Sequence, residues 1–428
     1  MRERLWARSP LSWLRAAALL ALVALGAGCG AGSASGRDAD AAAAPHSCPE
    51  TVMATLASVV RRVYAQGVQS ERTASAEAMI ERSKGLRVAI EAGNPKAARR
   101  AARGLIATGH MTNLIVTTTA GRALVSLGGP ALTPLRGTIR GAAGRPIATY
   151  TTSVWADSGI IAEGAGISEG QVALRAGEHS IGGSVELPPG ALGDHGTLDW
   201  HGASYQYASL PGRTYPAGDP IKIYLLKTVA AAEQLCGAGG EDTQVNVLER
   251  IANRIYEAER GPHTLPQIRR VQHNQPLLRA VANRDRVATR RASEALLHHH
   301  LVRLRVSAGG KLLDDLGGPF VLAPVGAELR LHGRRIGSFV LSIQDDEGYL
   351  RLTRRLVGLK VLMYMRGPDG RPRLVKNSLG PGVDRLASVP ASGSYSYRGG
   401  RYRVFTVDAE AFPSGPLTIR VLVPTPYA

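Results

Sequence analysis

A phrase that occurs twice constrains the fold of this chain more than any other feature of its sequence. "SLGGPALTPLRGTIR" begins at Ser126, and "DLGGPFVLAPVGAELR" begins at Asp315. A helical segment repeats upstream at matching positions, since "LASVVRRVYAQG" from Leu56 corresponds to "LERIANRIYEAE" from Leu248. Two copies of one phrase in similar surroundings predict that the chain is a tandem duplication.

The two repeats also share one order of expected elements. N-terminal helices come first, then two strands, a longer strand, a short helix, a strand and a closing hairpin. This order favours an α+β fold, in which helices pack on a mainly antiparallel sheet of about five or six strands per unit. We place the first unit at residues 48–237 and the second at 238–428, and a length of about 190 residues allows each to fold alone. Asn94, followed by Pro95, and Asp285 are predicted N-caps at matching helices.

The first 28 residues are typical of an export signal. Arginines precede the apolar run "AAALLALVAL" at residues 16–25, which is too short to cross a bilayer as a helix. Small residues then precede Cys29, as in bacterial lipoprotein signals. We therefore expect a lipid on Cys29 to anchor the protein to the cell membrane on its extracytoplasmic face, with simple secretion as the alternative. Residues 29–47, rich in Ala, Gly and Ser, are predicted to be a flexible tether.

The sequence has three cysteines, of which one is expected to carry a lipid and the other two could form a disulfide. If Cys29 carries lipid, Cys48 and Cys236 remain in a compartment that permits disulfides. Each lies just before a predicted helix at the start of one half, so a bridge would join the start of the first half to the junction with the second. Two unpaired thiols are the alternative.

The formal net charge of +18 is spread along the chain and forms no basic run. Arginines occur singly or in pairs on segments that read as solvated helix faces. Nucleic-acid binding requires a basic stripe with interleaved aromatic residues or a known module, and the sequence has neither. We therefore expect no nucleic-acid partner, while attraction to anionic lipids or wall polymers stays open.

Three segments of the second half carry a resemblance to a known family: "VSAGGKLLDDLGGP", "RRIGSFVLSIQDD", and "YRGGRYRVFTV" with the final strand "LTIRVLVP". In an exported chain, this order resembles the Cache (PDC-type, PAS-like) sensor domains of bacterial receptors, here as two units in series. The resemblance implies binding of a small molecule between the sheet and its flanking helix. The family's arginine- and tyrosine-rich amino-acid motif is absent from both halves. The sequence also has no kinase or chemoreceptor region, so we expect the signal to pass to a separate membrane receptor or kinase.

The same resemblance locates a ligand pocket along the long strand, the short helix and the next strand. In the second unit it indicates Asp346, Tyr349, Arg354, Tyr364 and Lys376. The counterparts in the first unit are Trp155, Asp157, Ile160 and Val172. The second unit's residues include more polar groups than those of the first unit. The second unit is therefore predicted to bind the ligand, and the first unit to be structural. The alternative is that both pockets are filled by their own side chains.

Motifs for catalysis and metal binding give little support to an enzyme. "GISEG" would make Ser168 a hydrolase nucleophile, but that motif needs a strand before the serine and a helix after it, the reverse of the order expected here. His298–His300 lack other ligands at useful spacing, and Asp346 in "QDDEGY" reads as a helix N-cap rather than part of a calcium loop. We expect no enzyme activity, cofactor or metal. A structural or adaptor protein of the cell envelope is the main rival, ahead of an envelope hydrolase.

Overall fold

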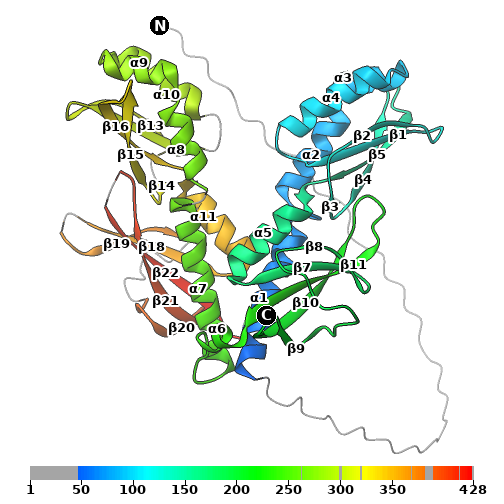
Figure 1. Cartoon of the computed structure of the whole chain (residues 1–428). Coiled ribbons are helices and arrows are strands. Elements are labelled where there is room, and N and C mark those ends of the chain that lie inside the picture. The colour runs from blue at the N-terminus through cyan, green and yellow to red at the C-terminus, as the bar shows by residue number, and fades with distance from the viewer. Residues whose placement is uncertain are drawn as a thin grey trace, which may run out of the picture. The chain divides into compact units, whose positions relative to one another are not determined.

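The structure is a computed structural model that describes residues 47–261, 263–297, 301–318, 321–367, 369–380, 389–413 and 415–426. From Ser47 onward these residues form one compact unit. The predicted signal segment, Cys29 and nearly all of the predicted tether lie outside the described residues. Figure 1 shows the arrangement of helices and strands that follows.

Four helices open the first repeat: α1 (Cys48–Ala65), α2 (Glu71–Arg82), α3 (Lys84–Glu91) and α4 (Pro95–Ala107). Side chains that bond the free N–H groups of the first turn fix where these helices begin. Ser47 forms a capping box with Glu50 at α1. Asn94 accepts a hydrogen bond from the backbone N of Ala97 at 3.1 Å, and Pro95 is the first helical residue, so the predicted cap is confirmed.

The strands of the first repeat fall into two groups on either side of α5 (Asp157–Ser168). Before it come β1 (Asn113–Thr118), β2 (Ala123–Leu127), β3 (Ala131–Leu132), β4 (Leu135–Arg140), β5 (Pro146–Ser153) and β6 (Trp155–Ala156). After it come β7 (Gln171–Ala176), β8 (His179–Gly183), β9 (His195–Trp200), β10 (Ala203–Arg213), β11 (Pro220–Thr228) and the short helix α6 (Val229–Glu233).

The second repeat begins with α7 (Gly240–Arg260), α8 (Leu265–Gln272), α9 (Gln275–Ala282) and α10 (Arg286–Leu297). Its first strands are β12 (Arg303–Ala308), β13 (Lys311–Gly317), β14 (Val321–Leu322), β15 (Val325–Leu331), β16 (Arg334–Ser342) and β17 (Gln344–Asp345). Then come α11 (Asp346–Leu352), the π-helical turn η1 (Thr353–Val357), β18 (Lys360–Arg366), β19 (Pro372–Asn377), β20 (Gly393–Tyr397), β21 (Gly400–Glu410) and β22 (Pro416–Pro424).

Strand order repeats between the two halves. The four-stranded sheets run β2-β1-β5-β4 and β13-β12-β16-β15, and the five-stranded sheets run β8-β7-β11-β10-β9 and β19-β18-β22-β21-β20. Neighbouring strands are antiparallel throughout these four sheets. The predicted α+β fold is confirmed, and the repeated order supports the duplication.

The number of sheets differs from the expectation of one sheet per unit. Each repeat divides its strands between two large sheets, because α5 or α11 interrupts the strands and each group covers its own core. Ser153 and Ser342 mark the exit from the first sheet at equivalent positions. Their hydroxyls donate to the carbonyls of Leu132 and Leu322, respectively.

Each four-stranded sheet has a separate core beneath its own helices. In the first repeat, Leu86 and Ala98 of the helices pack with Leu114 and Val116 of β1. The second repeat has an equivalent core under α8–α10. The five-stranded sheets share a third core, to which α1 and α7 both contribute. The predicted boundary at residue 237 falls between α6 and α7, yet the two repeats meet in one shared core.

A tyrosine on each long helix holds the neighbouring sheet in the same way. The Tyr64 hydroxyl accepts a hydrogen bond from the backbone N of Arg213 at 2.8 Å. The Tyr256 hydroxyl accepts one from the backbone N of Glu410, also at 2.8 Å. The two pairs occupy equivalent places in the repeats, so each long helix is bonded to the penultimate strand of its own five-stranded sheet.

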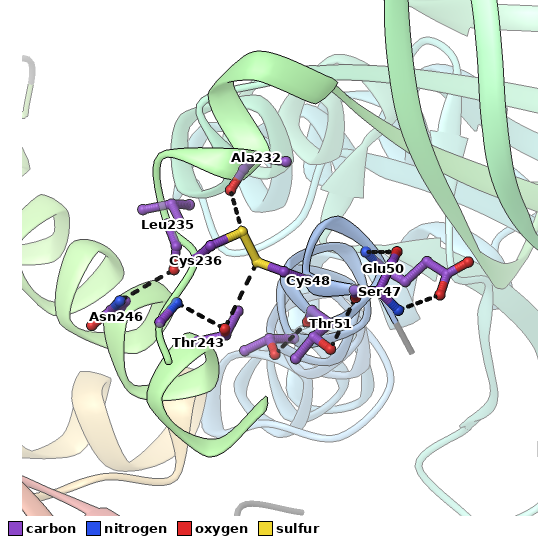
Figure 2. The surroundings of a disulfide bond; sticks show 11 residues. Ser47, Cys48, Glu50, Thr51, Ala232, Leu235, Cys236, Thr243 and Asn246 are labelled. Carbon is purple, nitrogen blue, oxygen red and sulfur yellow. Dashed lines mark hydrogen bonds between the residues drawn. A yellow bond between two sulfur atoms is a disulfide. The ribbon is translucent and has the colours of Figure 1, made fainter. Parts of the chain in front are cut away.

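The predicted disulfide between Cys48 and Cys236 is present, with Cα atoms 5.7 Å apart (Figure 2). Cys48 is the first residue of α1, and Cys236 follows α6. Thr243 of α7 donates from its hydroxyl to the Cys48 sulfur and accepts a hydrogen bond from the backbone N of Gly237. The bridge therefore joins the start of the first repeat to the start of the second.

Replacing Cys48 and Cys236 by Ser together is expected to lower the free energy of unfolding by up to about 5 kcal/mol, because the bridge closes a long loop in the unfolded chain. Urea unfolding of the oxidised protein and the double variant measures this difference. Reductant should lower the stability of the parent and leave the double variant unchanged. Equal stability of parent and variant under oxidising conditions would contradict a closed bridge.

Candidate functional site

Two of the five predicted ligand residues come together at the start of α11. The Lys376 ammonium lies 2.9 Å from the carboxylate of Asp346 and 2.8 Å from that of Glu347. The hydrogen bond that Lys376 donates to Glu347, followed by the one to Asp346, raises the pKa of Lys376. Asp346 is the first helical residue; Asp345 is the N-cap and accepts from the backbone N of Gly348, so the predicted cap is wrong by one residue. The ion pair ties β19 to the helix.

Tyr349 lies in the shared core and is fully buried. Its ring meets that of Tyr256 edge-on, with 6.5 Å between centroids. Among the described residues, no group forms a hydrogen bond with its hydroxyl. Burial raises the pKa of Tyr349 well above its ordinary value. Its counterpart in the first repeat, Ile160, is equally buried and apolar.

Tyr364, another predicted ligand residue, lies on the opposite face of its sheet from the shared core. Tyr364 packs with Leu362 in a cluster on the opposite face of the sheet from Val361 and Met363, which join the shared core. The Arg420 guanidinium lies over the Tyr364 ring, 4.5 Å from its centroid. The expectation that Tyr349 and Tyr364 line one pocket is therefore wrong, because side chains alternate along β18 and put Tyr364 on the far face.

Arg354 is exposed on η1. The first-repeat counterparts also serve packing: Ile160 and Val172 are fully buried, and the Asp157 carboxylate accepts from the backbone N of Ser158. The ligand-binding role of the five second-unit residues stays a prediction, since their placement neither assigns nor removes it.

Opposite effects on stability are expected when the two tyrosine hydroxyls are removed. Tyr256→Phe loses the bond to the Glu410 N–H and should lower the free energy of unfolding by about 1 kcal/mol. Tyr349→Phe removes a buried hydroxyl without a partner and should raise it by about 1 kcal/mol. Chemical unfolding of both variants gives the signs. A marked destabilisation by Tyr349→Phe would show that its hydroxyl is bonded in solution.

A hollow of about 420 Å³ lies where α5 of the first repeat meets α7, α11 and η1 of the second. We call it the seam hollow. Its apolar lining includes Ala162, Gly166, Ile167, Ile255, Leu352 and Leu356. The volume falls within the range of small-molecule pockets, about 300–1,000 Å³. A π-helical turn such as η1, which contributes Leu356, is frequent at functional sites.

Small residues on α5 account for the space. Ala162 and Gly166 lie one helical turn apart and line the hollow. α5 and the α11–η1 segment have equal lengths, so these positions correspond to Arg351 and Arg355 in the second repeat. The short run "AEGAG", opposite long side chains in the other copy, is the sequence signal for this space. Periodicity alone predicts a plain short helix in both copies and does not reveal the hollow.

An ion-pair cluster beside the hollow connects the repeats. Glu169 ends α5 with a φ of +48°, a left-handed conformation that costs energy for a non-glycine residue. Its carboxylate accepts two hydrogen bonds from Arg250 of α7, at 2.9 and 3.0 Å, and lies 3.4 Å from Arg254. At the equivalent position Gly358 has a φ of +69°, and a Cβ there would lie 2.3 Å from Arg62 of α1. The two helix ends thus contact the long helix of the other repeat.

The lining of the seam hollow also includes a histidine and carboxylates. His263 Nδ1 lies 3.2 Å from the carboxylate of Glu259, whose side chain is 11% exposed. The hydrogen bond to Glu259 raises the pKa of His263, and the charge of Glu163 on α5 adds to the rise. Arg254 and Glu257 complete the charged lining. The arrangement can hold a small ligand against apolar side chains, with charged groups beside it.

Of the residues considered for catalysis and metal binding, Ser168 does not line the seam hollow. Ser168 is buried at the end of α5, before strand β7, and its hydroxyl donates to the Gly164 carbonyl at 2.7 Å. His298–His300 lie outside the described residues. Within the described ranges, no cluster of three His, Cys, Asp or Glu side chains is placed to hold a metal. The same part of the chain contains no helix with the length and hydropathy needed to cross a bilayer.

Comparison with known proteins gives distant structural likenesses. No family model and no curated protein matches the chain. The periplasmic domain of Vibrio cholerae LuxQ is similar at 8% identity and a TM-score of 0.29, over 42% of this chain and 98% of that domain. An extracellular ligand-binding receptor from Desulfohalobium retbaense is similar at 10% identity and a TM-score of 0.25, over 54% of this chain and 47% of the receptor. Such low scores carry no argument about function.

Stability at different pH values tests the Glu169 cluster. Hydrogen bonds from Arg250 lower the pKa of Glu169, so its ionised form stabilises the folded state above the ordinary carboxyl pKa of about 4.3. This contribution is lost as the pH falls through the lowered pKa. Glu169→Gln should cost about 1 kcal/mol at pH 7, because Arg250 is more than half exposed, and less near pH 3. Urea unfolding at both pH values measures this, with exposed Glu178→Gln as control. Equal losses at both pH values would exclude an ionic role.

Proposed function

We propose that this protein is an extracytoplasmic small-molecule-binding protein of the sensor type, and that the ligand occupies the seam hollow. One observation carries the proposal: an apolar hollow of about 420 Å³ is lined by α5 of one repeat and by α7, α11 and η1 of the other. Its lining is mainly apolar and includes a few charged groups, as in ligand pockets generally. The proposed role is binding and not catalysis.

Its position between the repeats suggests how binding could become a signal. A ligand that contacts Gly166 on one side and Leu352 on the other stabilises the arrangement in which both are within reach. The ligand can shift the equilibrium between two arrangements of the repeats only by as much as its affinity differs between them. Because Glu169 and Arg250 connect the same elements, their ion pair would respond to the same movement. In this proposal a separate membrane receptor or kinase reads the change.

Cellular location forms part of the proposal. The disulfide between Cys48 and Cys236 supports an oxidising compartment outside the cytoplasm. The expected anchor, a lipid on Cys29, would hold the protein at the outer face of the cell membrane, with residues 29–47 as the tether. A mass spectrum of the protein extracted from membranes, compared with that of Cys29→Ser, would reveal the lipid.

A second candidate, an adaptor of the cell envelope without a small ligand, has one observation in its favour. The region first predicted to bind ligand in the second unit is occupied by its own side chains, with Tyr349 fully buried and Asp346 paired with Lys376. In that case the repeats are packed scaffolds, and their contacts with partner proteins are the function.

A thermal-shift screen of the chain from Gly30 onward separates the two candidates. Acids, amines, amino acids and nucleobases form the panel. A ligand at one hundred times its dissociation constant should stabilise the folded protein by about 2.7 kcal/mol. The absence of any stabilising compound would favour the adaptor.

Gly166→Phe provides the matched test of location. Gly166 has open space around an added Cβ and lines the seam hollow, so a phenyl group there should fill the hollow and abolish the shift. Gly104→Phe places the same group at another helical glycine with open space, on α4, and should leave the shift unchanged. An unchanged shift in Gly166→Phe would place the ligand elsewhere.

A further inference from the structure

The lining of the seam hollow is net negative, whereas the whole chain is net positive. The formal net charge of the protein is +18, whereas the charged lining of the hollow consists of three carboxylates, one guanidinium and one imidazole. With His263 neutral, the lining carries a net negative charge. This local reversal, beside apolar side chains, indicates the chemistry of the molecule that fits.

Some charged groups of that lining have an ion-pair partner and others do not. Arg254 lies 3.4 Å from Glu169, which is outside the hollow, so its charge is partly committed. Glu259 is nearly buried and has His263 as its partner. Glu163, on the facing helix α5, is half-buried and has no ion-pair partner within 4 Å among the described residues. It is close enough to His263 to raise its pKa.

We propose that the seam hollow binds a small organic cation, an apolar body with one protonated amine, and that the amine lies between Glu163 and Glu259. This assignment rests on the proposed function. His263 then acts as a built-in competitor: when protonated, it supplies the positive charge that the two carboxylates otherwise take from the ligand. The apolar body would lie against Ile167, Ile255 and Leu356.

Other charge types fit the hollow less well. A carboxylate ligand would enter beside Glu163, Glu257 and Glu259, and like charges in a partly desolvated site repel each other. A neutral apolar ligand would strip water from Glu163 without giving it a partner, and such desolvation of a charge is costly. A protonated amine offers three donors and a positive charge, so it satisfies both requirements.

The imidazole gives the site a dependence on pH with a definite sign. The groups facing His263 are Glu259 from α7 and Glu163 from α5, with Arg254 and Glu257 also in the lining. Their carboxylates raise the pKa of His263. Below that pKa the imidazolium makes the lining less negative; above it the lining is more negative and attracts the amine more strongly. Amine affinity should therefore rise as the pH increases through the pKa of His263.

Two matched series of probes test the cation assignment by isothermal titration calorimetry on the chain from Gly30 onward. One series is tryptamine, tryptophol and indole-3-acetate; the other is hexylamine, hexanol and hexanoate. In at least one series the amine should bind at least tenfold more tightly than its alcohol and its acid. Its affinity should be at least threefold higher at pH 8 than at pH 6.

Variants assign the effects to residues. Glu163→Gln should reduce amine affinity about tenfold and leave alcohol affinity unchanged, whereas the exposed Glu241→Gln should change neither. His263→Gln should remove the difference between pH 6 and pH 8. Gly166→Phe should abolish amine binding, and amine binding that survives this substitution overturns the assignment.

Failure of the cation assignment is distinguishable from failure of the proposed function. Binding of the alcohols or acids with equal or greater affinity, sensitive to Gly166→Phe, overturns the cation and leaves ligand binding in the hollow standing. The absence of binding by every member of both series, together with an empty thermal-shift screen, overturns both proposals.

Discussion

Packing of α1 against α7 is the contact on which the rest of the structure depends. Both helices contribute a fully buried apolar stripe to one core, with Val59 and Val60 from α1 and Val247 and Leu248 from α7. Burial of apolar surface is the dominant favourable term in folding, so a shared core keeps the repeats together. The disulfide at Cys48 fixes one end of the contact. Only with the long helices side by side does α5 meet α7, and this meeting creates the seam hollow.

The two repeats differ in sequence at the end of α5, where they contact each other. A helix end in the left-handed conformation is best served by glycine, and the second copy has Gly358 there. The first copy has Glu169, whose strained backbone is offset by two hydrogen bonds from Arg250 of the other repeat. On the same helix, Ala162 and Gly166 stand where the second copy has arginines. Strain, an inter-repeat ion pair and vacant space therefore occur together at one end of α5, as is common at functional positions.

Local patterns in the sequence were sufficient for much of the fold. Helix caps such as Asn94 depend on side chains within one turn, and strand alternation depends on neighbours two residues apart, so both can be predicted without tertiary contacts. Predicting the pocket required more. Tyr349 on α11 packs against the face of β18 that carries Val361 and Met363. Tyr364 lies on the opposite face of β18, so the two tyrosines do not face each other. Asp345 takes the cap one residue before the expected position, because the helix start is set by the pairing of β17 with β14.

By itself the sequence determined the duplication, the α+β class and the order of elements, since each is recorded in the chain as a repeat or a period. The tertiary structure alone decided that each repeat builds two large sheets, that both repeats share a core, and that the open space lies between them rather than inside the second unit. The physical reason is that a hollow is defined by side chains that do not meet. Gly166, which has no side chain, and Leu352 belong to different repeats, and only the packing of α1 on α7 brings them to the same hollow.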